Sequence, residues 1–406
     1  MAEQTCIIIG ASHAAAQLAT SLRQEGWLGD IHIVGDEAYL PYHRPPLSKE
    51  FLAGKKTEEE ILIRQAPIYE KHNIRFSVGF RVTSIDRANK TVVLDNGEIL
   101  TYDKLALTLG SRVRKVPIAG SDLPGVFYLR TIDDINQIKS YIGEGKNAVI
   151  VGGGYIGLET ASVLNQLGMN VTVLEMMPRV LQRVTTPELS AFYTRIHTEE
   201  GVKIITDSTV NALEGDHQVE RVIGSDGSQF NADLVIIGAG ILPNTELAES
   251  AGLEVNNGIV VDELARTSDK NIVAAGDCTL HPNPIYGRDI RLESVQNAVD
   301  QAKTAAATLC GKEKPYHALP WFWSDQYDLK LQIAGLSQGF DEVVIRGDIQ
   351  SSREFAVFYL KDNAVIAVDA VNKPQEFMFG KKLITNKIKV DKSKLADESI
   401  SIKELV

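Results

Sequence analysis

The sequence predicts an α/β fold in which two similar β-α-β units precede a C-terminal α+β region. The first observation is a short apolar strand, a glycine turn and a helix-forming stretch, which begin near residue 5. The second is the recurrence of this pattern from residue 147. The third is a change at about residue 318, after which no such unit occurs. At 406 residues, the chain has room for two or three domains.

The first unit starts with an apolar strand at residues 6–9, a tight turn at 10–15 and a helix-forming stretch at 16–23. A second strand at residues 31–34 ends in an acidic residue, Asp36. A turn of this kind lets backbone N–H groups at a helix N-terminus face a pyrophosphate, and the acid accepts hydrogen bonds from ribose hydroxyls. The pattern therefore predicts a dinucleotide site.

The second unit repeats these features with a complete glycine pattern. Its strand at residues 147–151 runs into Gly152, Gly154 and Gly157, and its second strand at 171–174 ends in Glu175. The first unit departs from this pattern, because Ser12 and Ala15 replace the later glycines and a serine Cβ leaves less room for a phosphate. Two units in one chain predict two dinucleotide sites.

Three further segments follow the same rhythm. Residues 102–110 and 232–240 are apolar strands that end in glycine turns, the second at Gly240. Residues 267–277 form a strand that ends in Gly-Asp, and a helix is expected after Arg291. Because a carboxylate at a strand end can accept a hydrogen bond from a polyol chain, we interpret Asp277 as a nucleotide ligand.

Composition argues against a nucleic-acid-binding protein and against a metal site. The chain carries 42 Lys and Arg against 53 Asp and Glu, a net charge of −11, whereas phosphate contacts need basic residues in excess. Cys6, Cys278 and Cys310 form no closely spaced pair, so we expect no disulfide framework and no metal-binding cluster.

The sequence also suggests a cytoplasmic location and no membrane partner. No run of 18 apolar residues occurs, and the first four residues lack the basic and apolar regions of a secretory signal. We therefore expect a reduced, cytoplasmic compartment.

The sequence resembles the two-dinucleotide flavoproteins with the glutathione-reductase-type fold. Within them it is most similar to the NADH-dependent ferredoxin reductases of bacterial oxygenase systems. The segments that carry the resemblance along the whole chain are residues 42–49, 151–159, 275–277, 291–298 and 321–327. The family's usual Ala-Thr-Gly after residue 107 reads Thr108-Leu-Gly here, which weakens any transfer of a role to Thr108.

The resemblance implies two Rossmann-like dinucleotide-binding domains, an FAD domain split by an NAD domain, and a C-terminal α+β domain that closes the flavin site. The expected boundaries are 1–113 and 246–317 for FAD, 114–245 for NAD and 318–406 for the last domain. The residues that the resemblance places around FAD are Gly10, Ala14, Asp36, Lys49, Val82, Arg130, Asp277 and Val295. Trp323 is a candidate for the flavin edge, and further cofactor-binding candidates are Ser12, His13, Arg44 and Glu293. The residues that it places around NADH are Gly152, Gly154, Tyr155, Ile156, Gly157, Glu159 and Glu175, and Gly240 is a further cofactor-binding candidate.

Lys49 and Glu159 are the candidate catalytic residues. A lysine beside the flavin can stabilise negative charge on the reduced ring, and a glutamate one turn into the second helix can pair with that lysine. Disulfide reductases of this fold place a cysteine pair against the flavin, but residues 44–49 contain no sulfur. We therefore hypothesise that NADH gives a hydride to FAD, and that single electrons then pass directly to a 2Fe–2S ferredoxin.

Cofactor choice should follow from Glu175. A carboxylate binds a ribose 2′-hydroxyl and repels a 2′-phosphate, which favours NADH over NADPH. Arg179 and Arg183 lie just downstream and could complicate this preference.

The C-terminal region is expected to present the docking face for the ferredoxin. Residues 354–360 and 364–369 alternate around a short polar turn and predict a hairpin. Residues 371–394 contain seven lysines against two acidic residues, a local charge of +5. This stretch, with Lys303 and Trp323, is our candidate surface for an acidic ferredoxin, although a charge run is equally typical of a solvated face.

Other functions remain open from the sequence. A reductase for rubredoxin or monodehydroascorbate would have the same fold and cofactors. A redox-sensing flavoprotein that binds nucleic acid is a further alternative, but the net charge of −11 argues against it.

Overall fold

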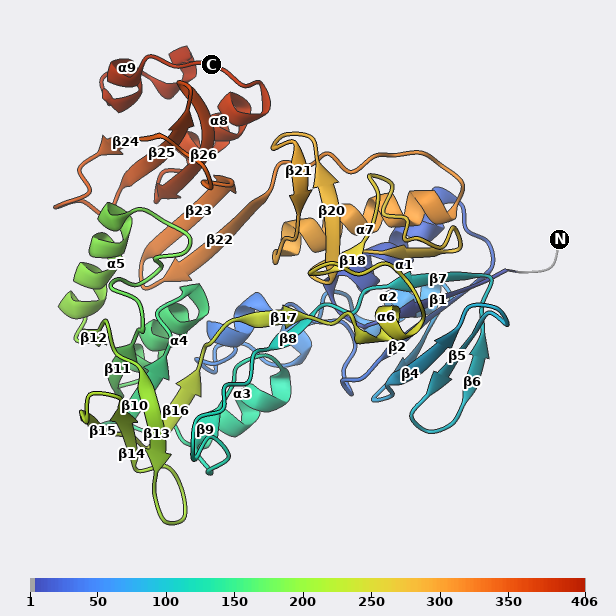
Figure 1. The fold of residues 1–406 in the computed structure, drawn as a ribbon, viewed down its shortest axis with the longest axis horizontal. Helices are drawn as coiled ribbons and strands as arrows, with labels where there is room; N and C mark the ends of the chain where they lie inside the picture. Colours follow the sequence, from blue (N-terminus) through green and yellow to red (C-terminus); the bar gives the residue numbers. More distant parts are fainter. Residues whose placement is uncertain (1–3, 406) are drawn as a thin grey trace. The chain divides into compact units, whose positions relative to one another are not determined.

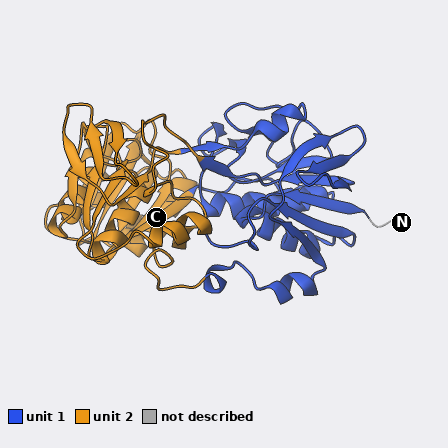
Figure 2. Cartoon of the chain, turned by 90° about the horizontal axis from the view of Figure 1, so that it is seen from below, with its two compact units in different colours: residues 1–43, 58–112, 241–320 blue, residues 44–57, 113–240, 321–406 orange. Residues whose placement is uncertain are grey.

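The computed structural model describes residues 4–405, and the chain within it forms two compact units. Unit 1 contains the described residues up to 43 together with 58–112 and 241–320, and unit 2 contains 44–57, 113–240 and the described residues from 321 onward (Figure 2). Each unit is therefore assembled from three separate stretches of the chain. The ribbon in Figure 1 shows the elements of both units.

A parallel five-stranded sheet forms the centre of unit 1. Its strand order is β19-β7-β1-β2-β3, and the neighbouring strands all run in parallel. The strands are β1 (Thr5–Ile9), β2 (Asp30–Gly35), β3 (Ile74–Val78), β7 (Lys104–Leu107) and β19 (Ile272–Ala274). Helices α1 (His13–Glu25) and α7 (Val295–Leu309) pack against each other and carry the apolar residues that cover the sheet.

Smaller antiparallel sheets and short helices complete unit 1. One small sheet has the order β4-β5-β6, and the other has the order β18-β20-β21. Their strands are β4 (Val82–Asp86), β5 (Thr91–Leu94), β6 (Ile99–Thr101), β18 (Ile259–Val260), β20 (Thr279–Asn283) and β21 (Arg288–Ile290). The short helical elements are η2 (Glu59–Ile61), α2 (Ala66–Lys71) and α6 (Glu246–Ser250). The sequence patterns did not predict either small sheet.

Unit 2 contains a second parallel sheet of five strands. Its order is β12-β11-β10-β16-β9. The strands are β9 (Val126–Phe127), β10 (Asn147–Val151), β11 (Asn170–Leu174), β12 (Lys203–Ile205) and β16 (Leu234–Ile237). The helical elements that accompany it are η1 (Pro45–Ser48), α3 (Ile132–Lys139), α4 (Tyr155–Gln166) and α5 (Pro187–Glu199). An unpredicted three-stranded antiparallel sheet is formed by β13 (Val210–Glu214), β14 (Arg221–Gly224) and β15 (Gln229–Asn231). Short strands mark the links between the units, β8 (Ser111–Val113) and β17 (Ile241–Pro243).

The remainder of unit 2 is an antiparallel sheet with helices. The strand order is β22-β23-β26-β25-β24. The strands are β22 (Trp321–Gln326), β23 (Leu329–Gly335), β24 (Glu342–Gly347), β25 (Phe355–Lys361) and β26 (Ala364–Val371). The helical elements are α8 (Pro374–Thr385), α9 (Lys392–Ala396) and η3 (Ile402–Leu405).

The hairpin predicted in this region is confirmed. Strands β25 and β26 pair in antiparallel register. Asp362 and Asn363 connect them with φ angles of 51° and 65°. Two successive residues in the left-handed region form the tight turn that matches the twist of a hairpin, and Asp and Asn tolerate that region well.

The predicted α/β fold class and both β-α-β units are also confirmed. One difference concerns the first helix, which begins at His13 rather than at residue 16. The alanines after Gly10 have high helix propensity, so the helix can start directly after the glycine turn. The four proposed domain segments remain a prediction, because the compact units group the C-terminal sheet with the second β-α-β unit.

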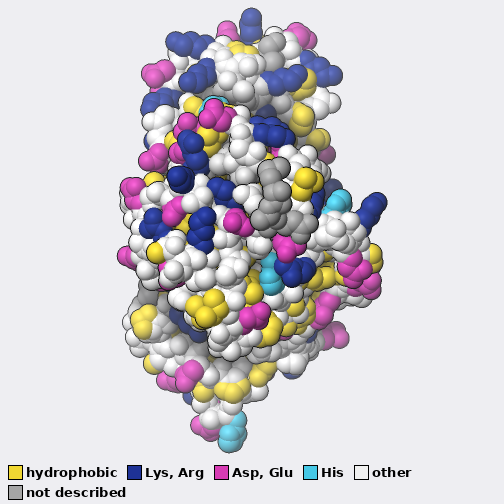
Figure 3. Space-filling view, turned by 90° about the vertical axis from the view of Figure 1, so that its right-hand side faces the viewer, with side chains coloured by type: hydrophobic (Ala, Val, Ile, Leu, Met, Phe, Trp, Pro, Cys, Tyr) yellow, Lys and Arg dark blue, Asp and Glu magenta, His cyan; other side chains and the backbone are white. Residues whose placement is uncertain are grey.

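The surface seen in Figure 3 intersperses basic and acidic side chains rather than separating them into large fields. Among the described residues, no helix combines the length and the apolar character needed to cross a membrane.

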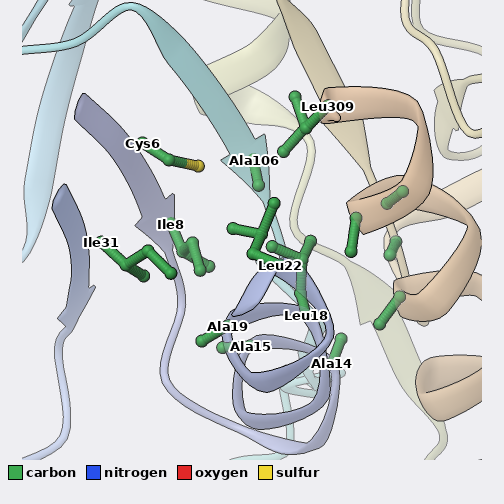
Figure 4. Close-up of a cluster of buried hydrophobic side chains, with 14 of the residues drawn as sticks. Cys6, Ile8, Ala14, Ala15, Leu18, Ala19, Leu22, Ile31, Ala106 and Leu309 are labelled. Carbon is green, nitrogen blue, oxygen red and sulfur yellow. The ribbon is translucent and has the colours of Figure 1, made fainter. Parts of the chain in front are cut away.

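The core of unit 1 is formed by small and branched side chains between the sheet and two helices. Figure 4 shows Leu18 and Leu22 of α1 directed toward Ile8 of β1, with Leu309 of α7 nearby. All four side chains are buried. Alanines on the facing surfaces of α1 and α7 allow the helix backbones to approach closely, so the end of β1 and the start of α1 are held firmly.

Candidate functional site

The glycine turn of unit 1 is shaped by a close approach between two strand ends. Gly10 has a φ of 102°, and a Cβ added there would lie 2.1 Å from the carbonyl oxygen of Thr108. The Thr108 hydroxyl donates to the carbonyl oxygens of Ile9 (2.9 Å) and Gly10 (3.1 Å). Thr108 therefore supports the turn, although it departs from the family pattern at this position.

The candidate FAD residues of unit 1 gather at one edge of the parallel sheet. Gly10 follows β1, Asp36 follows β2 and Asp277 follows β19 closely, so all three lie at the carboxyl ends of parallel strands in the same sheet. This is the edge at which α/β proteins bind nucleotides. The Asp36 carboxylate is exposed and pairs with Arg81 at 3.0 Å, while Asp277 accepts a hydrogen bond from the Ser111 hydroxyl at 2.8 Å.

The remaining candidates in unit 1 lie on or beside helix starts and strand starts. Ser12, His13 and Ala14 occupy the beginning of α1, Val82 begins β4, and Glu293 and Val295 flank the N-terminus of α7. In contrast, the cofactor-binding candidates Arg44, Lys49, Arg130 and Trp323 belong to unit 2. The glycine turn, the small residues after it and the acids at the strand ends fit a dinucleotide such as FAD.

The second glycine turn, in unit 2, is equally tight but opens toward solvent at one point. A Cβ on Gly152 would lie 2.5 Å from the Gly238 carbonyl oxygen, and one on Gly157 would lie 2.1 Å from the Gly152 carbonyl oxygen. A Cβ on Gly154 would meet no atom within 4 Å. Ile156 is 51% exposed beside it. The turn therefore leaves room at the start of α4 for the phosphates of NADH.

Glu175 lies where the sequence placed it, at the end of β11. Its carboxylate accepts hydrogen bonds from the backbone N–H of Gly153 (2.6 Å) and of Met177 (2.8 Å). The acid is thereby held against the glycine turn. Gly240, the other candidate near this sheet, has a φ of 91° that favours glycine.

Arg179, which lies just downstream of Glu175, forms hydrogen bonds with residues 182–190. Its guanidinium donates to the carbonyl oxygens of Thr185 (2.9 Å) and Gln182 (3.2 Å) and to the Ser190 hydroxyl (2.6 Å). These contacts commit Arg179 to holding the segment before α5, whereas Arg183 is exposed. The preference for NADH over NADPH stays a prediction.

Lys49 and Glu159 meet inside unit 2. The Lys49 ammonium lies 2.8 Å from Glu159 Oε2, with side-chain exposures of 11% and 2%. The two prolines Pro45 and Pro46 start the 3₁₀ helix η1, which delivers Ser48 and Lys49 to this point. A nearly buried ion pair of this kind is costly to break, because removal of one partner leaves the other charge uncompensated. The pairing itself is present in the structure, and its catalytic role remains a prediction.

Two serines that the sequence reasoning missed also hold Glu159. The Ser48 hydroxyl donates to Oε2 at 2.6 Å, and the Ser324 hydroxyl donates to Oε1 at 2.7 Å. Ser324 lies in the Trp-rich segment that carried the family resemblance. No polar-aromatic alternation marks it, because residues 321–326 read as three aromatic residues followed by three polar ones. Strand geometry alone places Ser324 and Trp323 on opposite faces.

Aromatic side chains on both faces of β22 contact one another or neighbouring helices. Tyr155, at the first position of α4, packs edge-on against Phe322 with ring centroids 5.3 Å apart, and burial raises the pKa of its hydroxyl. The ring centroids of Trp323 and Trp321 lie 5.7 Å apart, and Trp321 packs edge-on against Phe377 of α8. A place for Trp323 at the flavin edge therefore stays a prediction.

Asp325 adds a second carboxyl group near Lys49. Burial raises the pKa of Asp325, and the charge of Lys49 opposes that rise. Arg44 and Arg130 lie in the same unit, where Arg44 donates to the Arg130 carbonyl oxygen at 2.8 Å.

The predicted lysine-rich stretch forms α8, α9 and the connection between them. Lys373 pairs with Glu398 and Lys392 pairs with Glu342, so part of the positive charge is neutralised within the unit. The lysines that are exposed to solvent are Lys382, Lys387, Lys389 and Lys394. Lys303, in unit 1, pairs with Asp300 at 2.8 Å.

Two family models match the chain. The model described as pyridine nucleotide-disulphide oxidoreductase matches residues 4–302, and the model described as reductase C-terminal matches residues 321–406.

Individual relatives are similar along nearly the full length. Putidaredoxin reductase of Pseudomonas putida is 43% identical over 411 residues, which cover all of this chain and 97% of the relative. A rubredoxin-NAD(+) reductase of Pseudomonas putida is 38% identical over 370 residues, which cover 91% of this chain and 96% of the relative. A solved structure, the covalent putidaredoxin reductase–putidaredoxin complex, superposes with a TM-score of 0.97 at 43% identity, covering all of this chain and 98% of that chain.

Proposed function

Because this chain belongs to the pyridine nucleotide-disulphide oxidoreductase family, we propose that it is an FAD-dependent NADH:ferredoxin oxidoreductase that serves an oxygenase. The observation that carries the proposal is the buried Lys49–Glu159 pair at a position where thiol-dependent members of this fold carry cysteine. The full-length similarity to putidaredoxin reductase supports the same conclusion. When bound, FAD supplies the chemistry that converts a hydride from NADH into single electrons.

The cysteines of this chain are unsuited to a thiol relay. Cys6 and Cys278 are buried, and Cys310 is half-buried. Burial raises the pKa of the Cys278 thiol to about 11 and also raises the pKa values of Cys6 and Cys310. The thiolate is the reactive form, so these residues are inert near neutral pH. The thiols of this chain would therefore not serve as a relay between the two cofactors and an acceptor. The unpaired cysteines also support a reduced, cytoplasmic compartment.

Lys49 and Glu159 would act together at the hydride site. The Lys49 ammonium would stabilise negative charge that develops on the reduced flavin. Glu159 would hold that ammonium in place and offer an acceptor to the nicotinamide carboxamide. Glu175, fixed by two backbone N–H groups, supports a preference for NADH, because a carboxylate repels a 2′-phosphate.

The acceptor is proposed to be an acidic 2Fe–2S ferredoxin. The solved relative is a complex of a reductase with putidaredoxin, which supports an electron carrier of this class. We place the docking face near Trp323 and the exposed lysines of the stretch 371–394, with Lys303 as a further candidate. Rubredoxin is the second candidate acceptor, since one relative is named as a rubredoxin reductase.

Stopped-flow reduction by NADH under anaerobic conditions tests the hydride site. Lys49→Ala and Glu159→Ala are expected to slow flavin reduction by about 100-fold, because each removes a charge from a nearly dry site. FAD content, measured by absorbance, should stay close to that of the wild type. Unchanged reduction rates in both variants would contradict the assignment.

The acceptor is tested by mixing the NADH-reduced protein with purified 2Fe–2S ferredoxins and with a rubredoxin. We expect rapid multiple turnover with at least one acidic 2Fe–2S ferredoxin. Turnover with rubredoxin alone would favour the second candidate, and an absence of turnover with any carrier would favour the redox-sensing alternative.

A further inference from the structure

One face of strand β22 contacts helices α4 and α5. Phe322 packs against Tyr155 at the start of α4, Ser324 binds Glu159 one turn later, and Gln326 binds His197 near the end of α5. Because side chains alternate along a strand, Phe322, Ser324 and Gln326 lie on the same face of β22. The C-terminal sheet therefore contacts the hydride-site glutamate directly.

A continuous chain of hydrogen bonds runs from that glutamate to His197. The Ser324 hydroxyl donates to Glu159 Oε1 at 2.7 Å, the Gln326 amide Nε2 donates to Ser324 at 3.1 Å, and Gln326 Oε1 lies 2.8 Å from His197 Nε2. The exposed fractions are 2% for Glu159, 1% for Ser324, 1% for Gln326 and 0% for His197. In such a dry environment each of these bonds is strong, and an unmade one would be costly.

The direction of every bond in this chain follows from the charge of Glu159. The carboxylate that pairs with Lys49 can only accept, so the single hydroxyl proton of Ser324 must point toward it. Ser324 must then accept from the amide N–H of Gln326, which turns the amide oxygen toward His197. That oxygen cannot donate, so His197 must carry its proton on Nε2. The charge on Glu159 thus determines the tautomer of His197 through three successive hydrogen bonds.

The opposite oxygen of Glu159 is held from another element. Oε2 receives the Lys49 ammonium at 2.8 Å and the Ser48 hydroxyl at 2.6 Å, both from η1 and its end. Oε1 receives only the chain from β22 among the contacts described. The two oxygens are therefore tied to different parts of unit 2, so the carboxylate cannot rotate without breaking one of them.

We propose that Ser324, Gln326 and His197 are positioning residues that orient the Glu159 carboxylate toward Lys49 for hydride transfer. This inference rests on the proposed role of the Lys49–Glu159 pair. An amide cannot relay a proton in a single step, so the chain acts by orientation rather than by proton transfer. Burial also lowers the pKa of His197, which keeps the ring neutral near pH 7 and suits it to a single donating nitrogen.

The kinetic test compares variants at Ser324 with a matched control. Ser324→Ala should lower the rate constant of flavin reduction at saturating NADH by about tenfold or more, with a change of less than about twofold in the Kd for NADH, because misplacement of a reacting group chiefly affects the rate. Ser324→Thr keeps the hydroxyl and should restore most of the rate.

Ser162→Ala is the control for a lost buried hydroxyl. Ser162 is also buried on α4, but its hydroxyl donates to the main-chain oxygen of Glu159 at 2.8 Å rather than to the carboxylate. We expect wild-type reduction kinetics in this variant. An equal loss of rate in Ser162→Ala and Ser324→Ala would overturn the positioning role.

The second test does not depend on turnover. With ¹⁵N-labelled histidine, long-range ¹H–¹⁵N correlations distinguish the tautomers of the eight histidines in the chain. We expect His197 to be neutral and protonated on Nε2 at pH 7, and Gln326→Leu should shift only its signals appreciably, which also assigns them. A proton on Nδ1 in the wild type would overturn the inference.

These outcomes separate the inference from the proposed function. If Glu159→Ala slows flavin reduction while Ser324→Ala does not, the positioning role fails and the hydride-site assignment stands. If Glu159→Ala leaves reduction unchanged, the hydride-site assignment fails and the positioning role fails with it.

Discussion

Asp369 of β26 is a buried carboxyl group that the proposed reaction does not use. Its Oδ2 accepts hydrogen bonds from the Tyr359 hydroxyl at 2.6 Å and from the Thr185 hydroxyl at 3.0 Å, and only 2% of the residue is exposed. Burial raises the pKa of Asp369 to about 6, and the two hydrogen bonds oppose part of that rise. The residue joins the C-terminal hairpin to the segment before α5 at the cost of an unfavourable charge.

Asp369→Asn is expected to change the pH dependence of stability. The pKa of Asp369 is about 6 in the folded state and about 4 in the unfolded state. The free energy of unfolding of the wild type should therefore fall as the pH rises from about 4 to about 6. The Asn side chain accepts the same hydrogen bonds without the charge. The free energy of unfolding of the variant, relative to the wild type, should therefore increase by up to about 3 kcal/mol between pH 4 and pH 7. Denaturant midpoints of both FAD-loaded proteins at the two pH values measure this. A constant difference between variant and wild type would contradict it.

At the scale of elements, two glycines of the second glycine turn have different roles, one in packing and one in ligand binding. Gly157 lies where α4 crosses the turn after β10, and an added Cβ would come within 2.1 Å of a backbone oxygen. Gly154 caps the same helix with a φ of −80°, which any residue can adopt, and its Cβ would enter open space. One glycine is therefore required by the fold, and the other is free to serve the nucleotide.

Alanine substitutions should distinguish these two glycines. Gly157→Ala is expected to destabilise the protein by about 1–3 kcal/mol, because the backbone atoms it meets must shift. Gly154→Ala should leave stability within about 0.5 kcal/mol of wild type yet weaken NADH binding, because its methyl group takes the space offered to a phosphate. Thermal unfolding and NADH titration measure the two effects. Tight NADH binding by Gly154→Ala would argue against phosphates at this helix start.

At the scale of the whole molecule, charge is distributed unevenly. The chain has a net charge of −11, yet residues 371–394 carry +5, and several of these lysines are exposed. The overall repulsion of an acidic partner would be overcome only locally, over a range of roughly 10 Å at ordinary ionic strength. A basic surface of this kind steers encounter more than it adds affinity.

Salt should therefore slow ferredoxin reduction selectively. Raising the ionic strength from low to moderate values is expected to lower the rate with an acidic ferredoxin by about tenfold, while reduction of a small uncharged dye should hardly change. The double variant Lys387→Glu, Lys389→Glu should mimic this loss. Lys90→Glu, Lys270→Glu makes the same charge change in unit 1 and serves as the control. An equal effect of salt on both acceptors would count against the docking surface.

Much of the site could be predicted because its residues follow local patterns. The glycine turns at Gly10 and Gly152 and the acids Asp36 and Glu175 are specified by a strand, a turn and a helix that adjoin in sequence. The hairpin at residues 362–363 is specified in the same way. Short-range sterics and side-chain periodicity determine such units, so they are visible before the chain is folded.

The surroundings of Glu159 could not be predicted in this way. Ser48 and Ser324 lie 111 and 165 residues from Glu159 along the chain. His197 is connected to Glu159 through Gln326 and Ser324. No local pattern specifies contacts over such separations, because they depend on how the C-terminal sheet packs against α4 and α5.

The two β-α-β units, the C-terminal hairpin and the lack of sulfur in residues 44–49 follow from the order of neighbouring residues. Folding is what brings Lys49 to Glu159, holds Arg179 in its own segment and lets β22 supply a directed chain of donors. Local backbone preferences are encoded in neighbouring residues, whereas the orientation of a buried carboxylate is set by groups that only the folded chain brings within hydrogen-bond distance.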